Sequence, residues 1–198
     1  ITSVVGITRE ICEKNNLPVP GVNSISSEDW VVGACAYYRP DTEAMRKYTT
    51  PGINICLAKC ASSATEHQVR NWNWPGSITD REPFGVLCHE LGHHCDWLTG
   101  DVKYAYSSNY SQQVMEESGE PPITSYCPNP SEWFAEMFRL FVTNHALLLL
   151  IRPKTWRILT RKFQPVSNND WQYELGSNVP DRILSNLKKK VADAERRK

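Results

Sequence analysis

The pattern of apolar and polar residues predicts one helix and two short strands in the first third of the chain. Residues 2–16, with apolar positions that include Ile11, predict a helix that ends before the breakers in residues 18–21. Residues 30–38 are rich in Val, Cys and Tyr and predict a strand. Residues 53–57 follow a Pro-Gly turn and alternate enough to predict a second strand, a candidate partner of the first.

Two stronger helix signals lie in the middle of the chain. Residues 83–98 have Pro83 in the first turn and Gly100 just after the last turn, and these are the positions that proline and glycine prefer at helix ends. A second helix is predicted for residues 129–150, which open on Asn-Pro and stop before the next proline. A polar stretch, residues 101–119, lies between the two predicted helices.

No internal repeat or low-complexity segment divides the chain, so residues 1–198 are expected to form a single domain. Residues 1–20 contribute its N-terminal helix. Residues 153–198 are expected to form a helical extension, with a shorter helix, a loop and a last basic helix. A chain of 198 residues is long enough for one well-packed core.

Composition narrows the partners that the chain is expected to bind. Lys and Arg number 22 and Asp and Glu also number 22. The chain therefore carries no net charge that would favour binding to nucleic acid or to an anionic membrane. The longest apolar run, residues 146–151, is far shorter than the roughly 20 residues that span a bilayer. Seven cysteines cannot all pair within one chain and show no paired CxxC spacing, which favours a reducing compartment.

The first long helix carries the sequence HExxH, formed by His89, Glu90 and His93. Histidines four residues apart lie one above the other on a helix face, so both imidazoles can reach one zinc ion. Glu90 borders the same face and is placed to take a proton from a metal-bound water. Gly92 is unusual inside a helix and indicates the close approach of another backbone beside the metal.

A catalytic zinc site needs a third protein ligand. His94 points about 100° away from the face of His93, and Asp96 is better placed to orient a ligand than to be one. The search therefore moves to the second helix, where Glu132 and Glu136 lie four residues apart among large apolar residues. A buried carboxylate is costly unless it is paired or bound to metal.

Glu132 also has a simpler interpretation. With Asn129 as N-cap, Glu132 is the third helical residue and completes a capping box. That account leaves Glu136 unexplained, whereas both carboxylates facing the HExxH helix explain the pair. We therefore predict Glu132 as the third zinc ligand. Glu136 is predicted to accept a hydrogen bond from a ligand histidine, and Asp96 is assigned to the same supporting layer.

The two motifs together resemble a known family. HELGHHCD is followed some forty residues later by a run from Tyr126 through Glu132 and Glu136. This arrangement is similar to that of the gluzincin metallopeptidases, in particular the catalytic domain of anthrax lethal factor and related toxin and phage enzymes. The resemblance implies that Tyr126 donates a hydrogen bond to the oxyanion formed during hydrolysis.

The resemblance also implies an α+β, zincin-like fold, in which a small mixed sheet packs on the HExxH helix and the Glu132 helix crosses beneath the metal. The expected activity is zinc-dependent endopeptidase cleavage of a protein or peptide substrate, with Glu90 as general base. Two alternatives stay open. One is an inactive or structural zinc-binding interaction module, and the other is a metal-dependent amidase that acts on cell-wall peptide.

Overall fold

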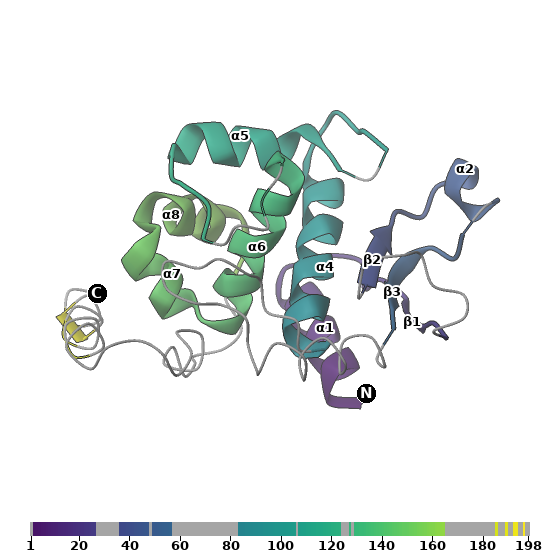
Figure 1. Ribbon diagram of the computed structural model, residues 1–198, viewed down its shortest axis with the longest axis horizontal. Helices are drawn as coiled ribbons and strands as arrows, with labels where there is room; N and C mark the ends of the chain where they lie inside the picture. Colours follow the sequence, from purple (N-terminus) through teal and green to yellow (C-terminus); the bar gives the residue numbers. More distant parts are fainter. Residues whose placement is uncertain are drawn as a thin grey trace.

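The computed structural model describes residues 2–26, 36–47, 49–56, 83–105, 107–123, 127 and 129–164, and positions 185, 189, 192, 193 and 196. Within these residues the chain forms seven helices and a three-stranded sheet, so the predicted α+β class is confirmed (Figure 1). The N-terminal elements are α1 (Thr2–Lys14), β1 (Val22–Ser24), β2 (Ala36–Arg39), α2 (Glu43–Arg46) and β3 (Gly52–Ile55). The later elements are α4 (Pro83–Thr99), α5 (Asn109–Ser118), α6 (Pro130–Thr143), α7 (His145–Ile151) and α8 (Pro153–Lys162).

The sheet is small and mixed, with the strand order β1-β3-β2. The central strand β3 is buried along its whole length, and it pairs parallel with β1 and antiparallel with β2. In β2 the buried Ala36 and Tyr38 alternate with the half-buried Tyr37 and Arg39. This alternation shows one row of side chains directed into the core, and the strand order places β2 at an edge of the sheet.

Both predicted strands are present, and they pair with each other. Strand β3 lies within the predicted 53–57 apart from its first residue, while Leu57 falls outside the described residues. Strand β2 covers the end of the predicted 30–38 and extends one residue further, and residues 30–35 also fall outside the described part. The short strand β1 has no counterpart among the predicted elements, because three residues are too few to show an alternating pattern.

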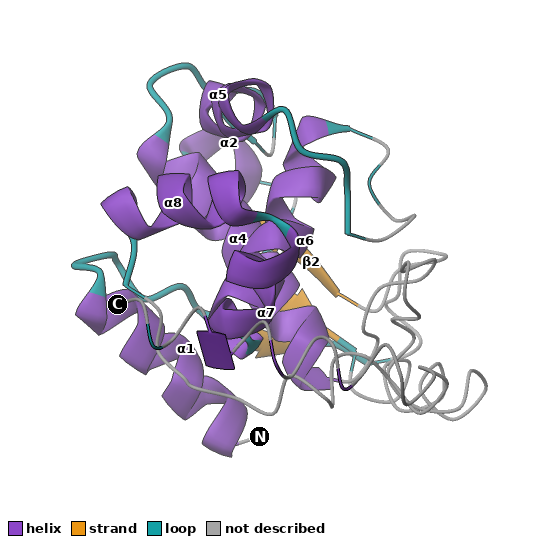
Figure 2. Cartoon of the chain, turned by 90° about the vertical axis from the view of Figure 1, so that its left-hand side faces the viewer, coloured by secondary structure: helices purple, strands orange, loops and turns teal. Residues whose placement is uncertain are grey.

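Helix α4 stands between the sheet and the group formed by α5 to α8 (Figure 1). Figure 2 shows that group from its own side, with the strands behind it. Helix α6 packs along α4, and every residue from Trp133 to Thr143 is buried. A helix that is covered on all sides belongs to the centre of a core, so the metal-ligand candidates on α4 and α6 lie on helices that are anchored in the core.

The contact between α4 and α6 explains Gly92. A Cβ added to Gly92 would lie 2.8 Å from the Cα of Ala135 and 3.2 Å from its carbonyl oxygen. The predicted close approach of another backbone at Gly92 is therefore confirmed, and α6 supplies that backbone. The missing side chain allows the two helices to come near enough for side chains of both to meet.

The prediction of one continuous helix over residues 129–150 is wrong. The helix ends at Thr143 and a second one, α7, begins at His145. Asn144 between them has φ −155° and ψ 74°, and its side chain accepts a hydrogen bond from the backbone N–H of Leu147. Asparagine is favoured at such capping positions over the interior of a helix. The cap at Asn144 therefore allows the chain to change direction between α6 and α7.

Helix α5 lies within the polar stretch 101–119, where no helix was predicted. Ser108 caps its start, and Gly119 ends it in the left-handed conformation with φ 58°. The shorter helix expected after residue 153 is α8, while most of the predicted basic helix falls outside the described residues. In the described part of the chain, no helix combines the length and the apolar character that a membrane crossing requires.

Candidate metal centre

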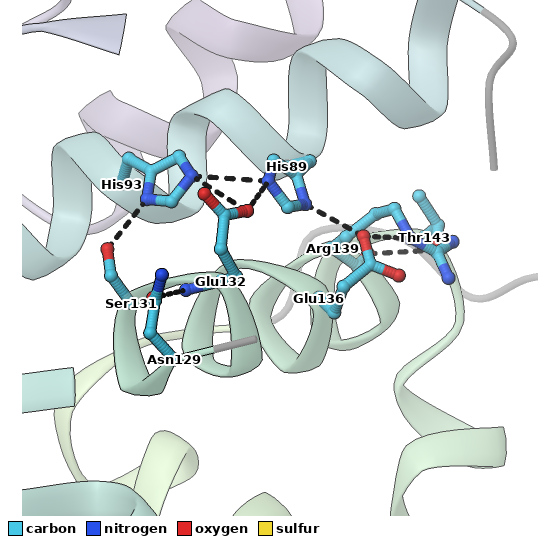
Figure 3. Close-up of polar contacts among 8 residues, drawn as sticks. All are labelled: His89, His93, Asn129, Ser131, Glu132, Glu136, Arg139 and Thr143. Atoms are coloured by element: carbon cyan, nitrogen blue, oxygen red, sulfur yellow. Dashed lines mark hydrogen bonds and ion pairs between the residues drawn. The ribbon is translucent and has the colours of Figure 1, made fainter. Parts of the chain in front are cut away.

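Helix α4 presents His89 and His93 side by side, as their spacing predicts. Their Nε2 atoms lie 3.2 Å apart and their rings meet edge to face at a centroid distance of 4.9 Å (Figure 3). Both residues are largely shielded from solvent, with side-chain exposures of 7% and 12%. Two imidazole nitrogens therefore face one point at the surface of the α4–α6 pair.

Helix α6 adds a carboxylate to the same point. Oε2 of Glu132 lies 3.0 Å from Nε2 of His89 and 3.6 Å from Nε2 of His93. Asn129 does cap the helix, because its Oδ1 accepts from the backbone N–H of Glu132 at 3.0 Å. The carboxylate of Glu132, however, faces the histidines rather than the cap (Figure 3). His89, His93 and Glu132 thus form a group that can hold a metal ion.

The distances within this group suit a small divalent cation. The three donor atoms stand 3.0, 3.2 and 3.6 Å from one another. Ligands placed tetrahedrally at about 2.0–2.1 Å from zinc stand about 3.3–3.4 Å apart. The triangle formed by the two nitrogens and the oxygen therefore matches one face of such a tetrahedron, with only small adjustments of the side chains.

A second layer of hydrogen bonds orients both imidazoles. Nδ1 of His89 lies 2.7 Å from Oε1 of Glu136, and Nδ1 of His93 lies 3.0 Å from Oγ of Ser131. With each Nδ1 occupied, the Nε2 atoms are the ones left to face the metal position. Glu136 thus lies where the sequence placed it. Ser131 was not identified from the sequence, since a polar residue in the first turn of a helix is ordinary.

Arg139 extends this layer into the core. Its Nε lies 3.5 Å from Oε1 of Glu136, and both side chains are fully buried. A buried carboxylate is stabilised by a buried cation that lies against it. Arg139 was not predicted from the sequence, although a charged residue in the apolar run after Glu136 is a signal of a buried ion pair. The described contacts form a chain from Arg139 through Glu136 to His89 (Figure 3).

The charges of the group are tightly linked. Burial alone would lower the pKa of His89, but hydrogen bonds to Glu132 and Glu136 outweigh it and raise the pKa to about 10. Burial also acts to raise the pKa of Glu132, but the two histidines prevail and hold it well below its usual range. Without a metal ion, a proton on His89 therefore balances the carboxylates, and a metal ion has to displace that proton.

Glu90 lies beside this group and is 6% exposed. Burial raises the pKa of its carboxyl, while His93, His89 and a hydrogen bond from the backbone of Tyr38 act in the opposite direction. A carboxylate with a raised pKa is a better proton acceptor than an exposed one. The position of Glu90 is thus suited to proton transfer rather than to metal binding.

An open cleft of about 510 Å³ leads to these residues. Its walls come from strand β2, from the segment 104–112 and from the first turn of α6, and the side chains of His89, Glu90, His93 and Glu132 line it. A molecule that enters the cleft therefore meets the candidate metal ligands and Glu90 together. The volume lies within the range of small-ligand pockets.

Asp96 has a different role from the one predicted. Its carboxylate accepts hydrogen bonds from the backbone N–H groups of Ser108 and Ser111, at 2.9 and 2.8 Å, and from the Ser108 hydroxyl. These contacts fix the start of α5 instead of orienting a ligand histidine. Asp96 lies on the part of α4 that α5 approaches. This contact could not be predicted, because the sequence did not indicate the helix α5.

Tyr126 and His94 are two further positions that were considered in the sequence. Tyr126, expected as the oxyanion donor, lies outside the described residues. His94 points away from the metal group, as expected, and bonds to the hydroxyl of Tyr38 and the carbonyl of Pro18. Cys12, Cys56 and Cys95 are buried free cysteines.

Comparisons of the chain with protein-family models, with curated proteins and with solved structures gave no match. The geometry of the site and the resemblance of its two motifs to those of the gluzincins are therefore the observations that bear on function.

Proposed function

We propose that this chain is a zinc-dependent endopeptidase of the gluzincin type. The observation that carries the proposal is the convergence of three donor atoms, from His89, His93 and Glu132, beside a buried Glu90 in an open cleft. A structural zinc site is normally closed by four protein ligands, whereas a catalytic site has three and keeps a position for water. Among the described residues, three side chains that could hold a metal ion lie beside a candidate base, and this combination supports a catalytic rather than a structural site.

Zinc is the metal that we propose for this donor set. Imidazole nitrogen is a ligand for zinc, copper, iron and nickel, while magnesium and calcium prefer sites made of oxygen alone. Two imidazoles and one carboxylate also form the ligand set of well-known zinc peptidases. When bound, zinc supplies a Lewis acid that polarises the scissile carbonyl and makes a nearby water more acidic.

The residues of the chain supply the other parts of the reaction. Glu90 accepts the proton of the attacking water, and the same carboxyl then donates it to the leaving amine. Glu136 and Ser131 hold the two imidazoles in the orientation that directs Nε2 to the metal. By the resemblance, the hydroxyl of Tyr126 donates a hydrogen bond to the developing oxyanion.

Replacing Glu90 by glutamine tests the proposal. Glu90→Gln removes the proton acceptor but preserves the shape of the side chain and all three metal ligands. We expect one zinc per chain in both proteins, measured by elemental analysis, and loss of peptide cleavage in the variant alone. A matched control is Glu116→Gln, which alters an exposed glutamate on α5 and should retain both zinc and activity.

The digestion of a peptide library separates the proposal from its alternatives. Zinc-dependent cleavage that Glu90→Gln abolishes supports the peptidase. No cleavage of any member by the zinc-loaded protein would contradict it and favour an interaction module. Hydrolysis of purified peptidoglycan without cleavage of unfolded protein would instead favour a cell-wall amidase.

A further inference from the structure

We propose that Arg39 forms a subsite for a carboxylate of the substrate, close to the bond that is cleaved. This inference rests on the proposed peptidase function and names the chemistry that the cleft selects. In an endopeptidase this carboxylate belongs to an acidic side chain of the substrate; the C-terminus of a peptide presents the same two oxygens to a guanidinium, and the test below distinguishes the two sources.

The position of Arg39 places it next to the reacting groups. It is the last residue of β2, directly after Tyr38, whose backbone bonds to the carboxylate of Glu90. Arg39 lines the same cleft as Glu90, His89 and His93. A substrate that lies in this cleft with its scissile bond at Glu90 can therefore also reach Arg39.

The guanidinium of Arg39 is held in place before any substrate arrives. It lies over the ring of Tyr37, with its central carbon 4.5 Å from the ring centroid, and its Nη1 donates to the carbonyl oxygen of Tyr38 at 3.1 Å. Tyr37 lines the cleft as well. A cation fixed on an aromatic face loses little further side-chain entropy when it binds an anion.

The charges along the cleft favour a carboxylate at Arg39 in particular. Among the described residues that line the cleft, Arg39 is the one lysine or arginine, and the carboxylates are Glu90 and Glu132. Both glutamates lie beside the histidines, where a metal ion would compensate their charge. Arginine presents a planar set of donors that fits a carboxylate in a two-bond arrangement, which a lysine does not reproduce.

The test compares matched peptides on the zinc-loaded protein. After a library digest has located a cleavage site, each position within two residues of the cleaved bond is varied between Asp or Glu and the neutral Asn or Gln. We expect a kcat/KM roughly 10- to 100-fold higher for the acidic peptide at one position, the effect of one hydrogen-bonded charge. A second series with free and amidated C-termini distinguishes a terminal carboxylate from a side chain.

Variants of Arg39 connect the preference to this residue. Arg39→Gln should reduce the preference to about twofold or less, and Arg39→Glu should reverse it in favour of lysine-bearing peptides. Binding of the same peptides to the Glu90→Gln protein, measured as Kd, should show the same order without turnover. The control is Arg46→Gln, because Arg46 is exposed and pairs with Asp41 on the surface; this variant should keep the preference of the native protein.

The experiments distinguish a wrong assignment of the Arg39 subsite from a wrong assignment of the peptidase activity. Cleavage that depends on Glu90 but is equally fast for acidic and neutral peptides would overturn the subsite and leave the peptidase standing. An acidic preference that survives in Arg39→Gln would overturn it in the same way. A protein that cleaves no peptide at all overturns both.

Discussion

At the scale of single residues, His93 and His94 show how one step along a helix separates two roles. Nε2 of His93 faces the metal group, whereas His94 lies on the other side of α4 and bonds to Tyr38 and Pro18. Burial lowers the pKa of His94, so it remains neutral at pH 7 and serves the packing of α4 on the sheet. The rotation of about 100° per residue made this difference predictable from the sequence.

The contact between Glu136 and His89 should set the affinity for zinc. In Glu136→Gln, the Nδ1–H of His89 keeps a neutral acceptor but loses a charged one, so the imidazole becomes a weaker ligand. Zinc affinity is expected to fall about 10- to 100-fold, measured by competition with a chromogenic chelator. Glu117→Gln, which alters an exposed glutamate paired with Arg161, is the control, and equal affinity in the two variants would contradict the role of Glu136.

Arg139 should matter for stability chiefly through Glu136. Arg139→Met removes one of the two cations that lie against the buried carboxylate of Glu136 and leaves protonated His89 as the other, so the loss of unfolding free energy should lie at or below the lower end of the roughly 3–5 kcal/mol that a fully broken buried ion pair costs. In the Glu136→Gln background the same substitution should cost much less, because no charge is left behind. Urea denaturation of the four proteins of this cycle measures the difference; an equal cost in both backgrounds would show that the pair is not coupled.

The site residues that could not be predicted from the sequence were missed for one physical reason. Glu132 and Glu136 were found because carboxylates four residues apart in an apolar helix require partners. Ser131 and Arg139 were missed because their partners depend on how α6 crosses α4. The spacing of residues along one helix does not predict how that helix crosses another.

At the scale of elements, the site depends on how closely α4 and α6 approach each other. Gly92 makes that approach possible, since the Cα of Ala135 occupies the space where a Cβ would lie. The two helices were predicted from their boundaries, and Gly92 indicated a near backbone, but the sequence did not say which backbone. It also failed to predict α5, whose start is fixed by Ser108 and by the distant Asp96.

Gly92→Ala tests this packing. Alanine favours a helix over glycine by about 1 kcal/mol, but overpacking a core contact costs about 1–3 kcal/mol, so we expect a net loss of stability and weaker zinc binding. Gly6→Ala in α1 is the matched control, because nothing lies within 4 Å of the position of its Cβ. That variant should gain up to about 1 kcal/mol. A stabilised Gly92→Ala protein in urea denaturation would show that the contact is loose.

At the scale of the whole molecule, the core determines that distant parts of the chain form one site. His93 and Glu132 are separated by 39 positions in the sequence, and α5 lies between them in chain order. The buried rings of Phe134 and Phe138 anchor α6. Because these side chains are fully buried, the ligands are held in place by packing that does not itself require a metal ion.

The stability of the metal-free protein should depend on pH through His89 and Glu132. Because the pKa of His89 rises from 6.5 to about 10 on folding, its contribution is complete below pH 6.5 and is lost as the pH rises toward 10. The pKa of Glu132 is lowered from 4.5, so its contribution is present above pH 4.5 and is lost in acid.

Bound zinc should offset the loss of stability that the metal-free protein shows at alkaline pH. Binding displaces the proton of His89, so the increase in Tm on adding zinc should grow as the pH rises from 6 to 9. Thermal unfolding at several pH values, with and without zinc, measures this increase. A zinc-induced shift in Tm that is constant over the range would show that no proton is exchanged.

The most direct test of the central claim is zinc-edge X-ray absorption on the zinc-loaded protein. We expect one zinc with two imidazole nitrogens and oxygen ligands at about 2.0–2.1 Å, four ligands in all with one from solvent. Replacing Glu132 by alanine should remove the protein carboxylate and weaken binding. A sulfur ligand at about 2.3 Å, or a zinc affinity unchanged in Glu132→Ala, would contradict the site formed by His89, His93 and Glu132.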